Sequence, residues 1–160
     1  MANDHDLTIS RFINAPRSAV WKAWSEPRRF EQWWIPAPMQ CKVVKMDMRA
    51  GGAFETLMRE GDSGATEKMW QPHVEGCFLE VVPEQRWSFT TSLTEGWRPF
   101  EPWLALTAIM TLTPEGTGTR YTARVLHKND ADSKKHEEMG FYDGWGTVID
   151  QLAKLVEQPR

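Results

Sequence analysis

The feature that most constrains the fold is a helical repeat near the C-terminal end, preceded by a long region with the pattern of β-strands. In segment 136–156, large apolar or aromatic residues recur at intervals of three and four, which predicts one face of an α-helix: Met139, Tyr142, Trp145, Ile149, Leu152 and Val156. A helix is only about 10–12 Å wide, whereas six or seven strands about 4.8 Å apart form a sheet about 30 Å wide. The sheet is therefore expected to curl around the helix and to leave space between the two.

Between positions 39 and 127, apolar and polar residues alternate with a period of about two. Gly51-Gly52 marks the first turn of this region. Pro72 indicates an edge strand or a bulge, because proline cannot donate to a hydrogen-bond ladder. Short turns favour antiparallel pairing of neighbours. Strands are expected at about 39–49, 53–60, 66–82, 87–93, 104–112 and 121–127, with an irregular loop at 95–102.

The N-terminal part adds one strand and two short helices. Alternation over 7–13 predicts the strand. Pro16 is suited to the start of a first helix, Ser25 to the N-cap of a second, and Pro36 to its end. The whole pattern predicts an α+β protein, with a curved antiparallel sheet of about six or seven strands around a long C-terminal helix.

Length and composition restrict the class of protein. A chain of 160 residues with 41% hydrophobic residues is large enough for one domain, 1–160, with a substantial core. A net charge of −3 without a basic cluster argues against nucleic acid or an anionic membrane as the main partner. The sequence has no signal peptide pattern and no apolar run of the roughly 20 residues that a bilayer span needs. Cys41 and Cys77 form no C-x-x-C motif, so a cytoplasmic protein without disulfides, metal or cofactor is expected.

Four stretches carry a resemblance to a known family: INAPRSAVWKAW at 13–24, FEQWWIP at 30–36, GCFLEVVP at 76–83, and segment 140–155. In this order the sequence resembles the START-like superfamily, also called Bet v 1-like or SRPBCC. Within it, the chain is similar to bacterial proteins that resemble the C-terminal domain of the Hsp90 ATPase activator Aha1. The resemblance covers nearly the whole chain and implies a helix-grip fold. It leaves function open, because the superfamily includes ligand carriers, polyketide cyclases, coenzyme Q-binding proteins and chaperone partners.

The aromatic residues divide into predicted core and predicted cavity wall. Five of the nine tryptophans are expected to pack in the interior: Trp21, Trp24, Trp33, Trp34 and Trp87. Rings suit the wall of an apolar ligand site, because each buries a large area at a low cost in entropy. The candidate ligand-binding residues are Phe54, Trp70, His73, Phe89, Trp97, Trp103, Met139 and Trp145. The alternative is that these rings fill the interior themselves.

Three glycines in the C-terminal helix need an explanation, because each costs about 1 kcal/mol relative to alanine. Close contact with the sheet is the favoured explanation for Gly140, Gly144 and Gly146. The alternative is a kink, or space for a ligand.

Three functions remain open. The first is binding of an apolar or aromatic small molecule between sheet and helix. The second is a cyclase or hydrolase of polyketide-cyclase type in the same cavity, with an acid or base among His73, His127 and His136, although no catalytic motif or metal spacing is present. The third is a factor associated with an Hsp90-like chaperone, or a stress-response protein. Apolar residues in the loop 95–103 also leave a homodimer open.

Overall fold

The computed structural model describes residues 5–61 and 69–157. In this part of the chain, seven strands form one antiparallel sheet in the order β1-β9-β8-β5-β4-β3-β2, and two short strands form a hairpin. The strands are β1 (Asp6–Ile13), β2 (Gln40–Met46), β3 (Ala53–Arg59), β4 (Gln71–Val82), β5 (Arg86–Thr90), β6 (Leu93–Thr94), β7 (Arg98–Pro99), β8 (Leu106–Glu115) and β9 (Gly118–His127). The helices are α1 (Arg17–Ser25), α2 (Pro27–Phe30), α3 (Asp130–Glu138) and α4 (Phe141–Val156).

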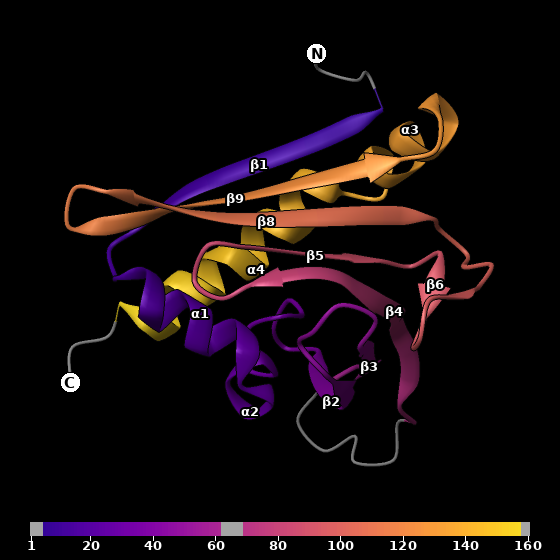
Figure 1. Cartoon of the computed structure of the whole chain (residues 1–160), viewed down its shortest axis with the longest axis horizontal. Helices are drawn as coiled ribbons and strands as arrows, with labels where there is room; N and C mark the ends of the chain where they lie inside the picture. Colours follow the sequence, from indigo (N-terminus) through magenta and orange to yellow (C-terminus); the bar gives the residue numbers. More distant parts are fainter. Residues whose placement is uncertain (1–4, 62–68, 158–160) are drawn as a thin grey trace.

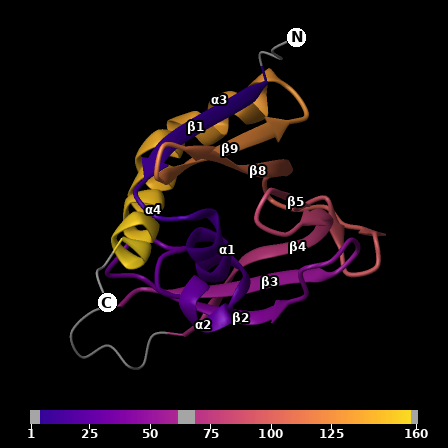
Figure 2. The ribbon, with the colours of Figure 1, turned by 60° about the vertical axis from the view of Figure 1, so that its left-hand side comes forward.

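The sheet bends around the C-terminal helices, which confirms the predicted helix-grip fold (Figures 1 and 2). Short turns join β2 to β3, β4 to β5 and β8 to β9, whereas β1 pairs with the distant β9, with Ile9 opposite Ala123. Helix α4 crosses the molecule behind β9, β8 and β5 in Figure 1, and α1 lies near its C-terminal end. The apolar face of α4 is buried through Val148, Ile149 and Leu152. Between α4 and the strands farther along the sheet, such as β4, there is space for a cavity.

A cluster of aromatic rings joins the short helices to the sheet. The ring centroid of Trp24 lies 4.8 Å from that of Phe30, 5.3 Å from that of Trp87 and 5.9 Å from that of Phe54. The indole N–H of Trp24 also donates to the hydroxyl of Tyr121 at 3.0 Å, which connects α1 to β9. All five side chains are fully buried. The two helices therefore close one end of the curved sheet through their aromatic side chains.

Pro72 lies at the predicted irregularity. It is opposite Leu57, and the register between β3 and β4 shifts between Thr56 and Leu57. Positions 66–68 of the strand predicted at 66–82 lie outside the described residues, and β4 begins at Gln71. The loop expected at 95–102 instead contains the hairpin of β6 and β7. Its positive φ values at Gly96 and Trp97 allow this tight reversal.

The predicted C-terminal helix is present as α4, but it begins at Phe141, and the residues before it form the separate helix α3. The helical region divides at Gly140, whose φ of 95° is left-handed and separates α3 from α4. Asn129 caps α3, with its side-chain oxygen accepting from the backbone N–H of Asp132 at 2.9 Å. The break rotates the buried face, so Met139 and Tyr142 are about half exposed, at 53% and 47%.

The three glycines of this region have three different roles. Gly140 supplies the left-handed break. A Cβ on Gly146 would lie 3.1 Å from the Arg11 guanidinium and 3.6 Å from the Ile9 side chain, so this glycine allows close contact with β1. A Cβ on Gly144 would meet no atom within 4 Å. Close contact therefore explains Gly146, the kink explains Gly140, and Gly144 faces open space.

The same substitution is expected to have opposite effects at Gly140 and Gly144. Gly144→Ala should raise the free energy of unfolding by up to about 1 kcal/mol, because alanine favours the helix and fits without a clash. Gly140→Ala should lower it by about 1–2 kcal/mol, because a Cβ disfavours left-handed backbone. Urea unfolding of both variants measures the two changes. If both substitutions changed the free energy of unfolding in the same direction, this explanation of the helix break would be wrong.

Candidate functional site

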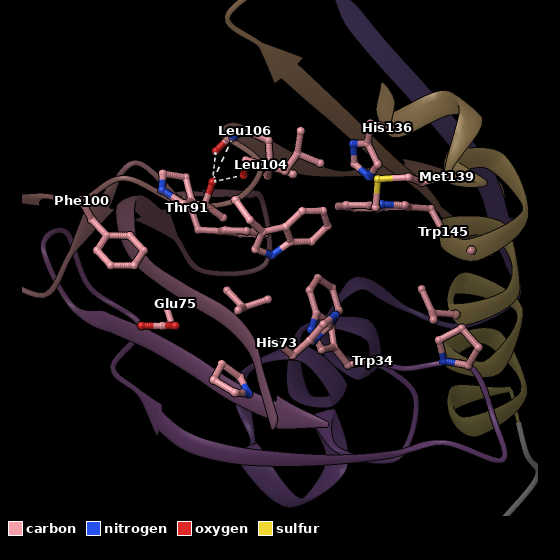
Figure 3. Close-up of a pocket in the computed structure, with 18 of the residues that line it drawn as sticks. Trp34, His73, Glu75, Thr91, Phe100, Leu104, Leu106, His136, Met139 and Trp145 are labelled. Atoms are coloured by element: carbon pink, nitrogen blue, oxygen red, sulfur yellow. Dashed lines mark hydrogen bonds between the residues drawn. The ribbon is translucent and has the colours of Figure 1, made fainter. Parts of the chain in front are cut away.

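A cavity of about 350 Å³ lies between the C-terminal helices and the central strands (Figure 3). Its walls come from β4, β5, β8, both C-terminal helices, the segment after α2 and the loop before β8. Most of the lining is apolar or aromatic. The lining residues are Trp34, Pro36, Pro72, His73, Val74, Glu75, Phe89, Thr91, Phe100, Glu101, Pro102, Trp103, Leu104, Leu106, His136, Met139, Gly144, Trp145 and Val148.

The structure brings five of the eight candidate ligand-binding residues to this cavity: His73, Phe89, Trp103, Met139 and Trp145. Figure 3 shows Trp145 and Met139 on the helical side and His73 on the opposite side. Phe89 has its ring 6.2 Å from that of Trp34 and is almost fully buried. Their role in binding a ligand remains a prediction.

Three candidates lie elsewhere. Phe54 is fully buried in the aromatic core, with its ring 4.7 Å from that of Phe89, so another ring separates it from the cavity. Trp70 precedes β4 and packs under the guanidinium of Arg59, at 4.3 Å from the ring centroid. Trp97, in the turn of the β6–β7 hairpin, is 47% exposed and lies with its indole against Gly51. These three residues are not part of the cavity wall.

Two further residues shape this site: Trp34, which was predicted to lie in the core, and Gln151, for which no role was predicted. Trp34 is indeed buried, but it also lines the cavity, and its indole N–H has no partner among the described residues. The Gln151 amide on α4 donates to the carbonyls of Trp33 and Ile35 at 2.9 and 3.0 Å, and its oxygen accepts from Ala37 N–H at 2.8 Å. Gln151 thus fixes the segment that carries Trp34. No sequence motif signals such a contact between distant segments.

The protonation of His73 follows from its partner Thr56 on the neighbouring strand. The Thr56 hydroxyl accepts from the Val74 N–H and lies 3.2 Å from His73 Nδ1. Thr56 is almost completely buried, so its own O–H is satisfied by donating to that nitrogen. Burial lowers the pKa of His73 to about 4, which keeps the ring neutral near pH 7. The neutral ring therefore carries its proton on Nε2.

His136 on α3 lines the opposite side of the cavity and forms a buried pair with His127 on β9. His127 Nδ1 lies 2.8 Å from the backbone carbonyl of His5, which only accepts, so Nδ1 carries a proton. His127 Nε2 lies 2.9 Å from His136 Nδ1. Because Nδ1 holds the ring proton of His127, His127 Nε2 accepts, so His136 donates from Nδ1 and leaves its own Nε2 unprotonated. Burial, together with the neighbouring His127, lowers the pKa of His136 to about 4.

Charge in the site is confined to exposed carboxylates. Glu75 and Glu101 line the cavity and are exposed, and Figure 3 shows Glu75 on the side away from α4. No lysine or arginine occurs among the described lining residues. The described part of the chain also contains no group of three or more residues suited to hold a metal ion. The arrangement is thus suited to binding uncharged apolar molecules.

Stability is expected to fall in acid through the two cavity histidines. Their folded-state pKa of about 4 lies below the ordinary 6.5, so the unfolded chain binds more protons between these values. As pH falls from 6.5 to 4, His73 alone should remove up to about 3 kcal/mol of the free energy of unfolding. Urea unfolding at several pH values should show a shallower decline for His73→Gln than for the original chain. If the free energy of unfolding fell equally with pH in both proteins, His73 would not be a source of the acid sensitivity.

The bent sheet, the C-terminal helix packed against it and the largely apolar cavity between them define a protein of the helix-grip class. The profile of the family described as "Activator of Hsp90 ATPase homolog 1-like protein" matches residues 14–157. The chain belongs to this family. None of the curated protein sequences matches it significantly.

Solved bacterial structures share the fold over nearly the whole chain. A protein from Nitrosomonas europaea is 37% identical, with a TM-score of 0.88, and the match covers 100% of this chain and 99% of that one. A protein from Chromobacterium violaceum is 26% identical over 96% of this chain and 99% of that one, with a TM-score of 0.74. A protein from Mycobacterium smegmatis is 24% identical over 98% of this chain and 93% of that one, with a TM-score of 0.77. At this identity the match shows a shared fold only. None of the helices in the described residues is long and apolar enough for a bilayer span.

Proposed function

We propose that residues 1–160 act as a single START-like ligand-binding domain, which binds an apolar or aromatic small molecule between the sheet and α4. The observation that carries this proposal is a cavity of about 350 Å³, at the lower end of the range for small-molecule sites. Its walls are mainly aromatic and apolar, and the few polar groups are spaced apart. The two free cysteines, Cys41 and Cys77, support a reducing, cytoplasmic location.

Titration with the neutral two-ring fluorophore 1-naphthylamine tests this proposal. Trp34, Trp103 and Trp145 line the cavity, so a bound fluorophore should quench tryptophan emission, and its own emission should shift to shorter wavelength. Both signals should saturate together at one molecule per chain. Met69→Ala is the matched control, because Met69 is 81% exposed and does not line the cavity. Absence of saturable binding by this and other neutral apolar probes would reject the proposal.

A cyclase or hydrolase function has one structural observation in its favour, since His73 and His136 both line the cavity. Their low pKa values make them weak bases near pH 7, where a general base works best with a pKa near the working pH. Binding without reaction is therefore the better supported proposal. Mass spectrometry of a bound polyketone before and after incubation distinguishes the two.

The family description supports a third proposal, association with an Hsp90-like chaperone. Exposed Trp97 and Phe100 near the hairpin of β6 and β7 offer an apolar surface for such a partner or for a second copy of the chain. Titration of purified Hsp90, with its ATPase rate as the readout, tests the chaperone. Sedimentation of the protein alone tests the dimer.

A further inference from the structure

The two cavity histidines present opposite hydrogen-bonding groups to the same apolar space. Thr56 fixes the His73 proton on Nε2, which makes this nitrogen a donor. The His5 carbonyl accepts from His127 Nδ1, so His127 Nε2 accepts from His136 Nδ1. His136 Nε2 is then unprotonated, which makes it an acceptor. The donor comes from β4 and the acceptor from α3, on opposite sides of the cavity (Figure 3).

Both nitrogens are available to a ligand. Neither has a hydrogen-bond partner within 5–61 and 69–157, and neither is among the fully enclosed polar atoms without a partner. Each ring uses its other nitrogen for a contact inside the protein, so its orientation is held while Nε2 stays open. Polar groups fixed in this way in an apolar wall determine which ligand orientation is accepted.

Size and charge restrict the ligand further. A volume of 350 Å³ equals that of about a dozen water molecules, which corresponds to a ligand of roughly two rings. Both imidazoles are neutral near pH 7, and the charged lining residues are Glu75 and Glu101. The Lys135 ammonium donates to the backbone carbonyl of Trp103 at 3.4 Å, but Lys135 does not line the cavity. A carboxylate or phosphate in the cavity would therefore meet no matching charge there.

We propose that the cavity selects an uncharged aromatic compound of about two rings with a hydroxyl group, which donates to His136 Nε2, and an acceptor such as a carbonyl, which receives the His73 Nε2–H. This inference rests on the proposed function and names its ligand class. His127 is a positioning residue, since it fixes the proton of His136 without lining the cavity.

Two matched pairs of naphthalenes test the two hydrogen bonds separately. At pH 7, 2-naphthol should bind about tenfold tighter than 2-methoxynaphthalene, which has no O–H to donate. 2-Acetylnaphthalene should likewise bind about tenfold tighter than 2-ethylnaphthalene, which has no acceptor. His136→Phe should abolish the first preference alone, and His73→Phe the second alone. His127→Leu should weaken the naphthol preference and leave the acetyl preference unchanged.

The outcomes separate this inference from the function on which it rests. If all four naphthalenes bind with similar affinity, the donor–acceptor selection is rejected and the apolar site stands. If none of them binds, the proposed function itself fails.

Nitrogen-15 NMR of the histidine rings in the original chain gives a test that needs no substitution. At pH 7 it should find the proton on Nε2 of His73 and on Nδ1 of His136 and His127. A proton on His136 Nε2, or on His73 Nδ1, would overturn the assignment of donor and acceptor.

Discussion

Gly144→Trp is expected to reduce the affinity for neutral apolar probes at least 100-fold, without loss of the fold. Gly144 lines the cavity, and a Cβ at this position meets no atom within 4 Å, so the indole enters open space. A tryptophan side chain contains nearly as many non-hydrogen atoms as the cavity can hold, so it leaves no space for a two-ring ligand. Loss of a helical glycine also favours α4. Titration with 1-naphthylamine and thermal unfolding measure the two effects.

Tyr142→Trp is the matched control on the same helix. Tyr142 is 47% exposed and does not line the cavity, so the added indole should leave the affinity within about twofold. Unchanged binding by Gly144→Trp, with a folded protein, would show that the probe binds elsewhere.

Trp24→Ala is expected to lower the free energy of unfolding by about 3–5 kcal/mol, a large part of the stability of a domain of this size. Trp24 is fully buried and contacts the rings of Trp33 and Trp34 at 5.9 and 5.4 Å. Its removal leaves a void between α1 and the sheet and takes away the partner of the Tyr121 hydroxyl. Urea unfolding followed by circular dichroism measures the change.

Trp97→Ala is the corresponding control for an exposed tryptophan. Its effect should stay below about 1 kcal/mol, because Trp97 is 47% exposed and lies against Gly51 outside the aromatic core. If the two variants lost similar stability, the aromatic cluster around Trp24 would not be the main source of stability at this end of the sheet.

The helix-grip fold could be predicted because its determinants are local. The periods of the apolar residues and the turn residues do not depend on distant contacts. The break at Gly140 could not be found in the same way, since the apolar spacing continues from Met139 through Trp145 as if the helix were unbroken. A glycine within a helical pattern is compatible with a kink, close contact or open space, and only the packing around it decides.

The cavity could be predicted in part. His73 on β4 and Phe89 on β5 were placed by strand alternation, and both line the cavity. Trp97 has a clear aromatic signal, but its position depends on the turn of a short hairpin. The pairing of His127 with His136 joins residues nine positions apart, from a strand and a helix, and follows from tertiary packing. Such contacts determine the chemistry of the site without a local sequence pattern.

The pairing of β1 with β9 has a consequence for synthesis of the protein on the ribosome. Residues 6–13 leave the exit tunnel before their partners, residues 119–126, which follow more than one hundred positions later. During this interval the first strand and the tryptophan-rich α1 have no completed sheet to cover them. Long-range pairing of this kind slows folding and prolongs the exposure of apolar segments. We therefore expect the nascent chain, rather than the finished protein, to be the form most dependent on protection from aggregation.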